Sequence, residues 1–404
     1  MQILAAASAG LTALLAPFYL QHLLVTIAAL LGRRRTPPPA GPAPRFAVVI
    51  PAHDEEGSVA ATVASCLKLE DPGAGYAVVV IADNCSDRTA EIARAAGAHV
   101  LERFDDVDKS KGHALRHYFE RPEADRPGGA FDAVVVVDAD TLVDAHLLKS
   151  FADELARGRD WLQCYYTVSN PSASWRTELL TLAFALSNGV WPRGMDRLGL
   201  GATLKGNGMC FSKRGLDRVP FRAAGLVEDL EFSWTLRVAG ERVGYVGGAR
   251  VYGEMVSRGG EAATGQRRRW EAGRRALRGR FTGPIMGSKV INLWRKLMYV
   301  VELRTPPLVE LAGWLGAASL VHVPAATGIR MAGLSLWLAT PHAAMWLTLL
   351  AYVLSPVAAA GLPARYLLSL GQVPRYAAWK LLAATGRAPA AWVRTRREGS
   401  GPAR

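Results

Sequence analysis

Hydrophobic residues are distributed unevenly along this chain of 404 residues, and their pattern divides it into segments of three kinds. Residues 1–31 form one long apolar run, in which Gln21 and His22 are the strongly polar interruptions. Residues 46–256 alternate short apolar runs with amphipathic stretches, and residues 306–362 return to a long apolar run. The pattern predicts an α/β domain flanked by apolar helices.

The N-terminal run is long enough to cross a membrane, because a transmembrane helix needs about 20 apolar residues. Arg33, Arg34 and Arg35 follow it directly. A cleaved signal peptide carries its basic residues before a shorter apolar run. We therefore expect an uncleaved span over 1–31 with the arginines in the cytosol, and a buried core helix is the alternative. Residues 32–45 hold five prolines and are expected to form a stiff linker.

The second apolar run, 306–362, is too long for one span. Arg330, Pro341 and His342 interrupt it, so we expect a hairpin of two spans, which makes about three transmembrane helices in all. The tail, 363–404, carries eight Lys or Arg residues and one acidic residue, so it is expected on the cytosolic side. These features predict a multi-pass protein of the inner (cell) membrane whose α/β domain is cytosolic.

The central segment contains three short runs rich in β-branched residues, 46–52, 77–83 and 133–140. Each is typical of a strand that is buried on both faces. Helix-like stretches, 56–69 and 87–97, lie between the first runs, and Gly97 marks the end of the second stretch. Repeated β-α-β units predict a doubly wound, mostly parallel sheet with flanking helices.

Carboxylates follow each predicted strand, at 53–57, 82–87 and 138–140. Ligands of such sheets bind at the carboxyl ends of the strands. Asp138 and Asp140 are two residues apart, and alternation along a strand would place them on the same side. Two hard oxygen donors suit Mg²⁺ or Mn²⁺ bound to a diphosphate. Any one of these acids alone could instead be a helix cap.

Two further stretches are open to a structural or a functional interpretation. In "GLVEDLEFSWTLRVAG" (225–240), Glu228 and Asp229 open a predicted helix. They either favour the helix dipole or supply a general base. In "LKGNGMCF" (204–211), two glycines around an asparagine permit close backbone approach to a ligand, or simply form a turn.

Composition and missing motifs exclude several classes of protein. The four cysteines contain no CxxC pair, so neither a zinc site nor a disulfide framework is indicated. The first strand has no GxGxxG after it, and the chain has no GxxxxGK[ST], which excludes dinucleotide-binding and P-loop proteins. The net charge of +13 suits a phosphate-rich partner, but the basic residues cluster beside the apolar runs. This favours lipid, and we expect no nucleic-acid partner.

Seven motifs, in order, resemble those of the membrane-bound family 2 glycosyltransferases, the group that contains the cellulose, chitin, hyaluronan and poly-N-acetylglucosamine synthases. The motifs are "PAHDEE", "IADNCSD", "KSKGHAL", "DAD", "GNGMCF", "VED" and "QRRRW", and they span about residues 45–275. The resemblance implies a GT-A fold of Rossmann-like type and transfer of a sugar, with inversion, from a nucleotide donor that is expected to be UDP-linked. "VED" replaces the more common Thr-Glu-Asp and keeps the acid pair.

The resemblance also implies roles for single residues. Those expected at the nucleotide-sugar donor are Asp54, Glu55, Glu56, Asp83, Lys111, Asp138 and Arg269. Asp140, with Asp138, would bind the Mg²⁺ or Mn²⁺ ion.

On the acceptor side, Asp229, beside Glu228, would be the general base. Gln266, Arg269 and Trp270 match the family's QxxRW, within the segment 257–305 that is expected to hold interfacial helices. The residues expected near the acceptor are Gln266, Trp270, Gly206, Asn207 and Gly208. Arg274, Arg275, Arg278 and Arg280 are expected to bind anionic lipid headgroups, at about 1 kcal/mol each.

The sequence therefore predicts a membrane-anchored, inverting hexosyltransferase that acts on a lipid, lipid-linked or glycan acceptor at the cytosolic face. A processive exopolysaccharide synthase is an alternative, although three spans leave little to line a pore. A non-catalytic, transferase-like membrane scaffold is a further alternative.

Overall fold

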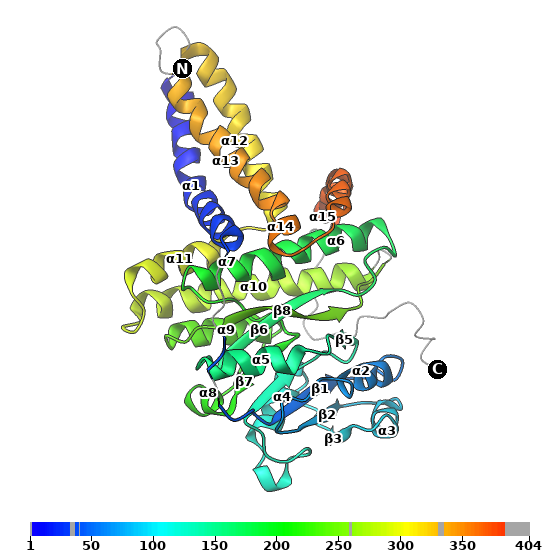
Figure 1. Ribbon diagram of the computed structural model, residues 1–404. Helices are drawn as coiled ribbons and strands as arrows, with labels where there is room; N and C mark the ends of the chain where they lie inside the picture. The colour runs from blue at the N-terminus through cyan, green and yellow to red at the C-terminus, as the bar shows by residue number, and fades with distance from the viewer. Residues whose placement is uncertain (1, 33–36, 40, 258–260, 330–334, 384–404) are drawn as a thin grey trace.

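A computed structural model describes residues 2–32, 37–39, 41–257, 261–329 and 335–383, and its helices and strands separate into three parts (Figure 1). An α/β domain lies at one end. Three long helices, the helical stem, extend from the other end. Between them α6, α10 and α11 run across the molecule as a transverse layer.

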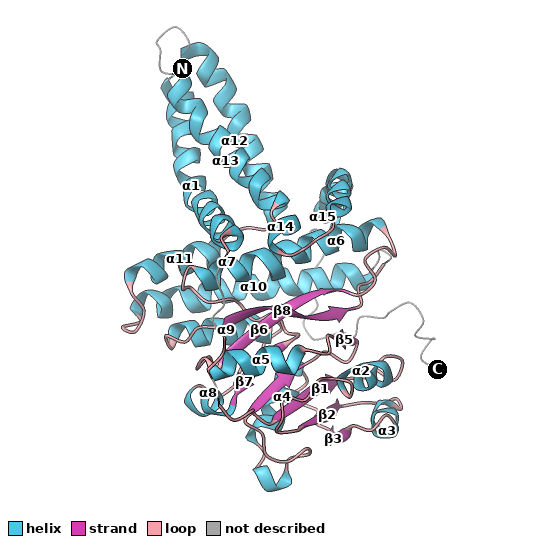
Figure 2. Cartoon of the chain, in the orientation of Figure 1, coloured by secondary structure: helices cyan, strands magenta, loops and turns pink. Residues whose placement is uncertain are grey.

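The α/β domain is built on one eight-stranded sheet of mixed direction (Figure 2). In spatial order its strands are β3 (His99–Arg103), β2 (Tyr76–Asp83), β1 (Phe46–Ala52), β4 (Ala133–Val136), β7 (Met209–Ser212), β6 (Trp161–Val168), β8 (Gly244–Gly253) and β5 (Thr141–Val143). The first four strands are parallel, whereas β7 is antiparallel to both of its neighbours and β5 is antiparallel to β8. The pairing of β6 with β8 is again parallel, so parallel pairings are found in both halves of the sheet, but the sheet as a whole is mixed and not mostly parallel as expected.

The predicted strand 133–140 is shorter than expected, because β4 ends at Val136. Beyond it the backbone N–H of Asp138 donates to Asn207 Oδ1 at 3.2 Å, and the N–H of Thr141 donates to the Asp138 carbonyl at 3.2 Å. The chain therefore turns at the acidic residues before it enters β5. The argument from strand alternation for Asp138 and Asp140 was wrong, although both side chains are partly exposed on either side of the buried Ala139.

Both faces of the sheet are covered, so its central strands are apolar on both sides. On β1, Phe46, Val48 and Ile50 pack into one core cluster, and Ala47 and Val49 pack into the other. The helices of this domain are α2 (Val59–Cys66), α3 (Thr89–Ala95), α4 (Lys111–Glu120), η1 (Glu123–Asp125), α5 (Leu147–Ala156), α7 (Trp191–Arg197), α8 (Lys213–Arg218) and α9 (Glu228–Val238). Gly97, with φ of +97°, follows α3 as the sequence predicts.

The helical stem consists of α1 (Gln2–Leu30), α12 (Leu308–Ile329) and α13 (Ser335–Leu354). Leu15, Leu311 and Leu349 are among the side chains buried between them. Two of the described helices are long and apolar enough to cross a membrane, over Ala9–Leu30 and Pro341–Ala359, and the apolar part of α12, Leu308–Leu320, is shorter. A buried core helix, or a signal sequence near the N-terminus, would meet the same criterion.

The transverse layer contains α6 (Trp175–Phe184), α10 (Glu261–Gly287) and α11 (Leu293–Arg304). Within the described residues, the remaining short elements are the π-helical turn η2 (Ala185–Val190), α14 (Pro356–Ala359), η4 (Ala364–Gln372) and α15 (Val373–Ala383). The layer is tied to the stem by α1, where Gln21 Nε2 donates to the Met298 carbonyl at 2.8 Å.

Candidate active site

A lysine and three carboxylates from distant parts of the chain meet beyond the carboxyl end of β4; we call Lys111, Asp138, Glu228 and Asp229 the acid–lysine cluster. Lys111 Nζ contacts the Asp138 carboxylate and lies 3.9 Å from Glu228 Oε1. It also donates to the Gly206 carbonyl at 2.5 Å. The lysine thereby joins the strand end, the glycine loop and the start of α9.

The residue after Lys111 explains why these segments come so close. A Cβ on Gly112 would lie 2.3 Å from the Ala223 carbonyl oxygen, so only glycine fits there. Ser110 Oγ, the N-cap of α4, also donates to the Ala224 carbonyl at 3.2 Å. The first turn of α4 thus packs on the backbone that leads into α9, which places Lys111 beside Glu228.

The glycine loop supports the cluster from the opposite side. Gly206 and Gly208 have φ of +78° and +65°, which glycine adopts without strain. A Cβ on Gly208 would lie 2.2 Å from Cys164 Sγ, and one on Gly206 would lie 3.4 Å from Asp229 Oδ2. Asn207 is fully buried, and besides accepting from Asp138 its amide donates to Thr141 Oγ1 at 2.8 Å. The Asn207 side chain therefore holds the Asp138 segment in place, and its predicted contact with the acceptor stays a prediction.

Burial dominates the electrostatics of the two acids on α9. Burial raises the pKa of Glu228, Lys111 opposes the change and the charges of Asp229 and Asp138 add to it, so that the pKa lies at about 7. Burial also raises the pKa of Asp229, against the opposing effects of its hydrogen bond with Leu230 N–H and of the Lys111 and Lys205 charges. A carboxylate whose pKa lies nearer to neutrality suits general-base catalysis.

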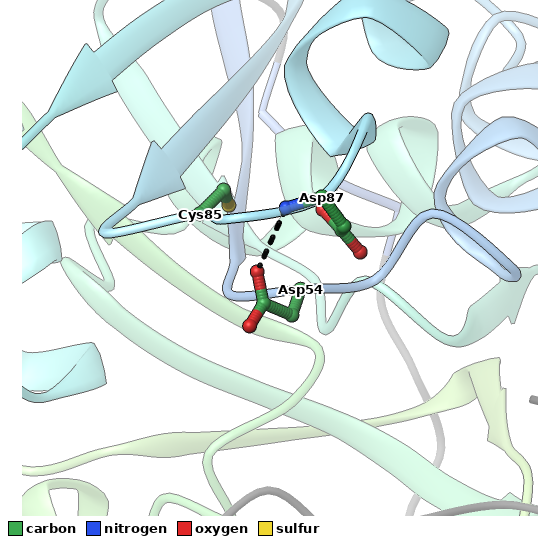
Figure 3. A group of neighbouring side chains, drawn as sticks. All are labelled: Asp54, Cys85 and Asp87. Atoms are coloured by element: carbon green, nitrogen blue, oxygen red, sulfur yellow. Dashed lines mark hydrogen bonds between the residues drawn. The ribbon is translucent and has the colours of Figure 1, made fainter. Parts of the chain in front are cut away.

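The loops after β1 and β2 form the other acidic part of this edge. Asp54 Oδ1 accepts a hydrogen bond from the Ser86 N–H at 2.6 Å. It accepts a second one from the Asp87 N–H at 3.3 Å (Figure 3). Glu55 N–H donates to Thr89 Oγ1 at 2.8 Å, and Glu56 N–H donates to Asp87 Oδ2 at 3.1 Å. The two loops are therefore bonded into one unit.

Asp83, at the end of β2, belongs to the same edge. It is 7% exposed and forms a 2.6 Å ion pair with Arg103 on the neighbouring β3. The structure thus gathers the predicted donor residues Asp54, Glu55, Glu56 and Asp83 along the parallel half of the sheet, and Lys111 and Asp138 next to them where the strand direction changes.

The family model described as "Glycosyltransferase like family 2" matches residues 43–273, which is more than half of the chain. The chain belongs to this family.

Two relatives extend this finding. The low-salt glycan biosynthesis hexosyltransferase Agl6 of Haloferax volcanii is 32% identical over 116 residues, which are 29% of this chain and 26% of that protein, so the chain spans about a quarter of this curated relative. The solved mannosyltransferase PcManGT of Pyrobaculum calidifontis is 17% identical, with a TM-score of 0.53, over 88% of this chain and 98% of that one. This likeness shows a shared GT-A-like fold that extends beyond the residues of the family model.

A third structure, the glucosyl-3-phosphoglycerate synthase of M. tuberculosis, is 18% identical over 58% of this chain and 80% of that chain, with a TM-score of 0.39. At this TM-score the likeness adds nothing to the description of the fold.

Two groups of residues could hold the metal ion that is expected in this site. Asp54, Cys85 and Asp87 offer ligand atoms within 4.8 Å of one another (Figure 3). Their carboxylates, however, accept hydrogen bonds from the two loops, and burial raises the pKa of the Cys85 thiol to about 11. Asp138 contacts Lys111 beyond the strand end, and Asp140, two residues further on, accepts from Thr141 Oγ1 at 3.1 Å through its Oδ1. Their oxygen donors suit Mg²⁺ or Mn²⁺ better.

The family's QxxRW sequence lies on α10 in the transverse layer. The side chains of Gln266 and Arg269 lie outside the described residues, so their predicted contacts remain predictions. Trp270 is 37% exposed and lines a cavity at the foot of the helical stem. Arg274, Arg275 and Arg278 line the same cavity, whereas Arg280 is bonded to Glu231. The expectation that Arg280 serves lipid headgroups is therefore not supported.

Sequence reasoning missed three residues that shape this site. Arg103 and Gly112 act through contacts between segments remote in the chain, which no local pattern reveals. Lys205 lies in the quoted "LKGNGMCF", and its charge directly before the glycine pair was a signal that could have been used.

Proposed function

We propose that this protein is a membrane-anchored, inverting glycosyltransferase that moves a hexose from a nucleotide sugar to a lipid, lipid-linked or glycan acceptor at the cytosolic membrane face. The observation that carries the proposal is the acid–lysine cluster, which lies where the strand direction of the sheet changes in a chain of family 2. Ligands of α/β sheets bind at the carboxyl ends of the strands where the strand order reverses, which in this sheet is between β1 and β4.

Residues at the ends of the parallel strands, together with Lys111, would bind the nucleotide-sugar donor. Asp54, Glu55, Glu56 and Asp83 would contact the nucleoside, and Lys111 would attract the diphosphate. The nucleoside is expected to be uridine, and because the PcManGT structure contains GDP-Man and Mn²⁺, guanosine donors belong in the test as well.

The first turn of α9 would supply the general base that acts on the acceptor. Asp229 takes the proton from an acceptor hydroxyl, whose oxygen forms a bond to the anomeric carbon from the face opposite the nucleotide. The bond from that carbon to the diphosphate oxygen breaks, and its electron pair stays on the diphosphate, so the configuration inverts. The Lys111 ammonium stabilises that charge, and Arg269 is proposed to do the same.

A divalent ion fits this scheme as a partner of the strand-end carboxylates. Asp140, together with Asp138, would hold Mg²⁺ or Mn²⁺, which when bound neutralises charge on the diphosphate. Because Lys111 already contacts Asp138, the two cations would share the task of balancing the acids in this part of the site.

Membrane anchoring is supported by the two apolar helices of the stem and by the basic residues beside them. The lipid or glycan nature of the acceptor is supported by the position of Trp270 at the foot of this stem, where its ring would stack on an acceptor sugar.

The test is a donor screen on the full chain in lipid nanodiscs. Nucleotide sugars, Mg²⁺ or Mn²⁺ and total membrane lipid are supplied, and nucleoside diphosphate release and product mass are measured. Asp229→Asn should abolish release, while Asp217→Asn, an exposed acid on α8, should not. An acceptor heavier by one sugar supports the proposal, and a ladder of masses would make the protein a processive synthase. Absence of release with every donor would favour the non-catalytic scaffold.

A further inference from the structure

A cavity of about 580 Å³ lies between the helical stem, the transverse layer and the first turn of α9. This volume is within the range of about 300–1,000 Å³ that small-molecule sites occupy. Most of its wall is apolar, with side chains from α6, η2, α12, α13 and η4. Representative members are Leu179, Leu182, Leu186, Leu308, Tyr352 and Leu370.

Charged residues from α6, α10, α11 and α12, and Lys205 from the glycine loop, also line this cavity. The cations that line it are Arg176, Lys205, Arg274, Arg275 and Arg278, and the carboxylates are Glu271, Glu302 and Glu310. Glu302 is already neutralised by a 2.7 Å ion pair with the buried Arg237. Five cations and three carboxylates among the described residues thus line the cavity, and this excess of positive charge favours a bound anion.

Lys205 connects this cavity with the acid–lysine cluster. It directly precedes Gly206, whose carbonyl accepts from Lys111 and whose Cα faces Asp229. Its own backbone N–H is held by Gln163 Oε1 at 2.8 Å, so the loop position is fixed. No ion pair or hydrogen bond joins the Lys205 ammonium to a residue that the structure describes. Burial lowers the pKa of Lys205, Asp229 and Glu302 oppose the change and Arg274 and Arg237 add to it, so that the pKa lies at about 8.

A phosphate suits these surroundings better than a neutral polar group does. A partly buried ammonium that lacks a direct partner is costly unless an anion compensates it, and guanidinium groups bind phosphate oxygens in pairs. The long apolar wall, continuous with helices of the stem, suits a hydrocarbon chain and not a sugar polymer, which would require polar walls.

We propose that this cavity is the acceptor chamber, that it takes an amphiphile with one long hydrocarbon chain and a phosphate monoester, and that Lys205 is the specificity residue at which the phosphate binds. The assignment as acceptor rests on the proposed function; the binding site itself does not.

The first experiment measures binding without any donor. The full chain in phosphatidylcholine nanodiscs is exposed to a photoreactive farnesyl phosphate and, separately, to the corresponding alcohol, and labelled peptides are identified by mass spectrometry. The phosphate probe should label α6 and α12 about tenfold more strongly than the alcohol does, because a hydrogen bond to a charged group contributes roughly this factor. Equal labelling by the two probes would overturn the proposal.

Variants then assign the phosphate to Lys205. Lys205→Met should reduce labelling by the phosphate probe about tenfold and leave labelling by the alcohol unchanged, and Lys205→Arg should retain most of the phosphate preference. The matched control is Lys149→Met, an exposed lysine on α5, which should change neither. If the Lys205→Met protein still prefers the phosphate probe over the alcohol, Lys205 does not bind the phosphate and the proposal is wrong on this point.

Chain length tests the hydrocarbon part. In a series of n-alkyl phosphates that compete with the probe, affinity should rise about fourfold per methylene group and level off once the cavity is full. Ala183→Trp, on the cavity wall at α6, should make the plateau appear at a shorter chain, whereas Ala95→Trp, exposed on α3, should not. Affinity that does not depend on chain length, or competition by inorganic phosphate or phosphatidylglycerol as strong as that of the alkyl phosphates, would contradict the single-chain ligand.

The outcomes separate this inference from the proposed function. Specific labelling in a protein that releases no nucleoside diphosphate from any donor would keep the phosphate-lipid site and reject the transferase. Turnover without phosphate-dependent labelling would keep the transferase and reject the site.

Discussion

Two groups of carboxylates line the same edge of the sheet, and the pKa of Asp54 in the first group is shifted in the opposite direction to those of Glu228 and Asp229 in the second. Burial would raise the pKa of Asp54, but hydrogen bonds from Ser86 and Asp87 and the charge of His53 outweigh it, so the pKa is lowered. At Glu228 and Asp229, burial prevails and raises both values. The comparison teaches that the supply of N–H donors, and not the residue type, decides whether an acid stays an anion or can exchange a proton.

The largest effect is expected from replacing Asp229, the proposed general base. Asp229→Asn should lower kcat by about 10²–10⁴-fold, the usual contribution of a general base. Steady-state kinetics of nucleoside diphosphate release would measure it, with Asp217→Asn as the control. Activity within a few-fold of the parent protein would place the base elsewhere.

The dependence of activity on Mn²⁺ distinguishes two candidate metal sites, Asp138 with Asp140 and Asp54 with Cys85 and Asp87. Asp140→Asn should raise the Mn²⁺ concentration required for half-maximal activity by at least about tenfold, whereas Cys85→Ala should leave it unchanged. Titration of chelator-treated protein with Mn²⁺ would measure this. The reverse result would transfer the ion to Asp54, Cys85 and Asp87.

The pH profile sharpens the contrast between the two groups. Because the base acts deprotonated and burial raises the pKa of Asp229, kcat/KM should fall about tenfold per pH unit on the acid side of a midpoint above the usual value for aspartate. Glu228→Gln removes a negative neighbour of Asp229, so the midpoint should move to lower pH. A midpoint that stays in place would show that the two acids are not coupled.

The raised pKa of Glu228 also affects the stability of the folded protein. A carboxylate whose folded pKa lies above its unfolded pKa contributes stability that is present below the unfolded value and is lost as pH rises through the folded value. At pH 8 the charged Glu228 is therefore a cost, and Glu228→Gln should raise Tm by about 2–4 °C. Thermal unfolding at pH 5 should show little difference between the two proteins, and a gain at both pH values would point to a cause other than charge.

The smallest effect is expected from the first group. Asp54→Asn keeps an oxygen that can accept from Ser86 and Asp87, and it loses only the charge, so we expect a loss of about 1 kcal/mol in stability. Donor KM should rise a few-fold with no change in the midpoint of the pH profile. A shifted midpoint would mean that Asp54 also titrates in the working range.

The parts of the fold that depend on local patterns were predictable. The strand 46–52, the start of a helix at Glu228 and the end of another before Gly97 are all where the sequence places them. Apolar periodicity and turn chemistry act over a few residues, so they can be recognised in one sequence.

Pairings between distant segments were not predictable in this way. The antiparallel strand β7 lies beside β4 although about 70 residues separate them, and this pairing makes the sheet mixed. Lys111, Asp138 and Glu228 were each selected from separate motifs, but their direct contacts depend on the absence of a side chain at Gly112, which acts through Ala223.

The sequence by itself determined the family, the order of the motifs, the apolar helices and the residue types available for chemistry, because these are properties of the local chain. Only the tertiary structure decided which acids have a raised pKa and which arginines form ion pairs. It also decided that Lys205 lies between a cavity of about 580 Å³ and the carboxylates of the acid–lysine cluster. Burial, charge coupling and close packing are sums over neighbours in space, and a linear chain does not specify those neighbours until it has folded.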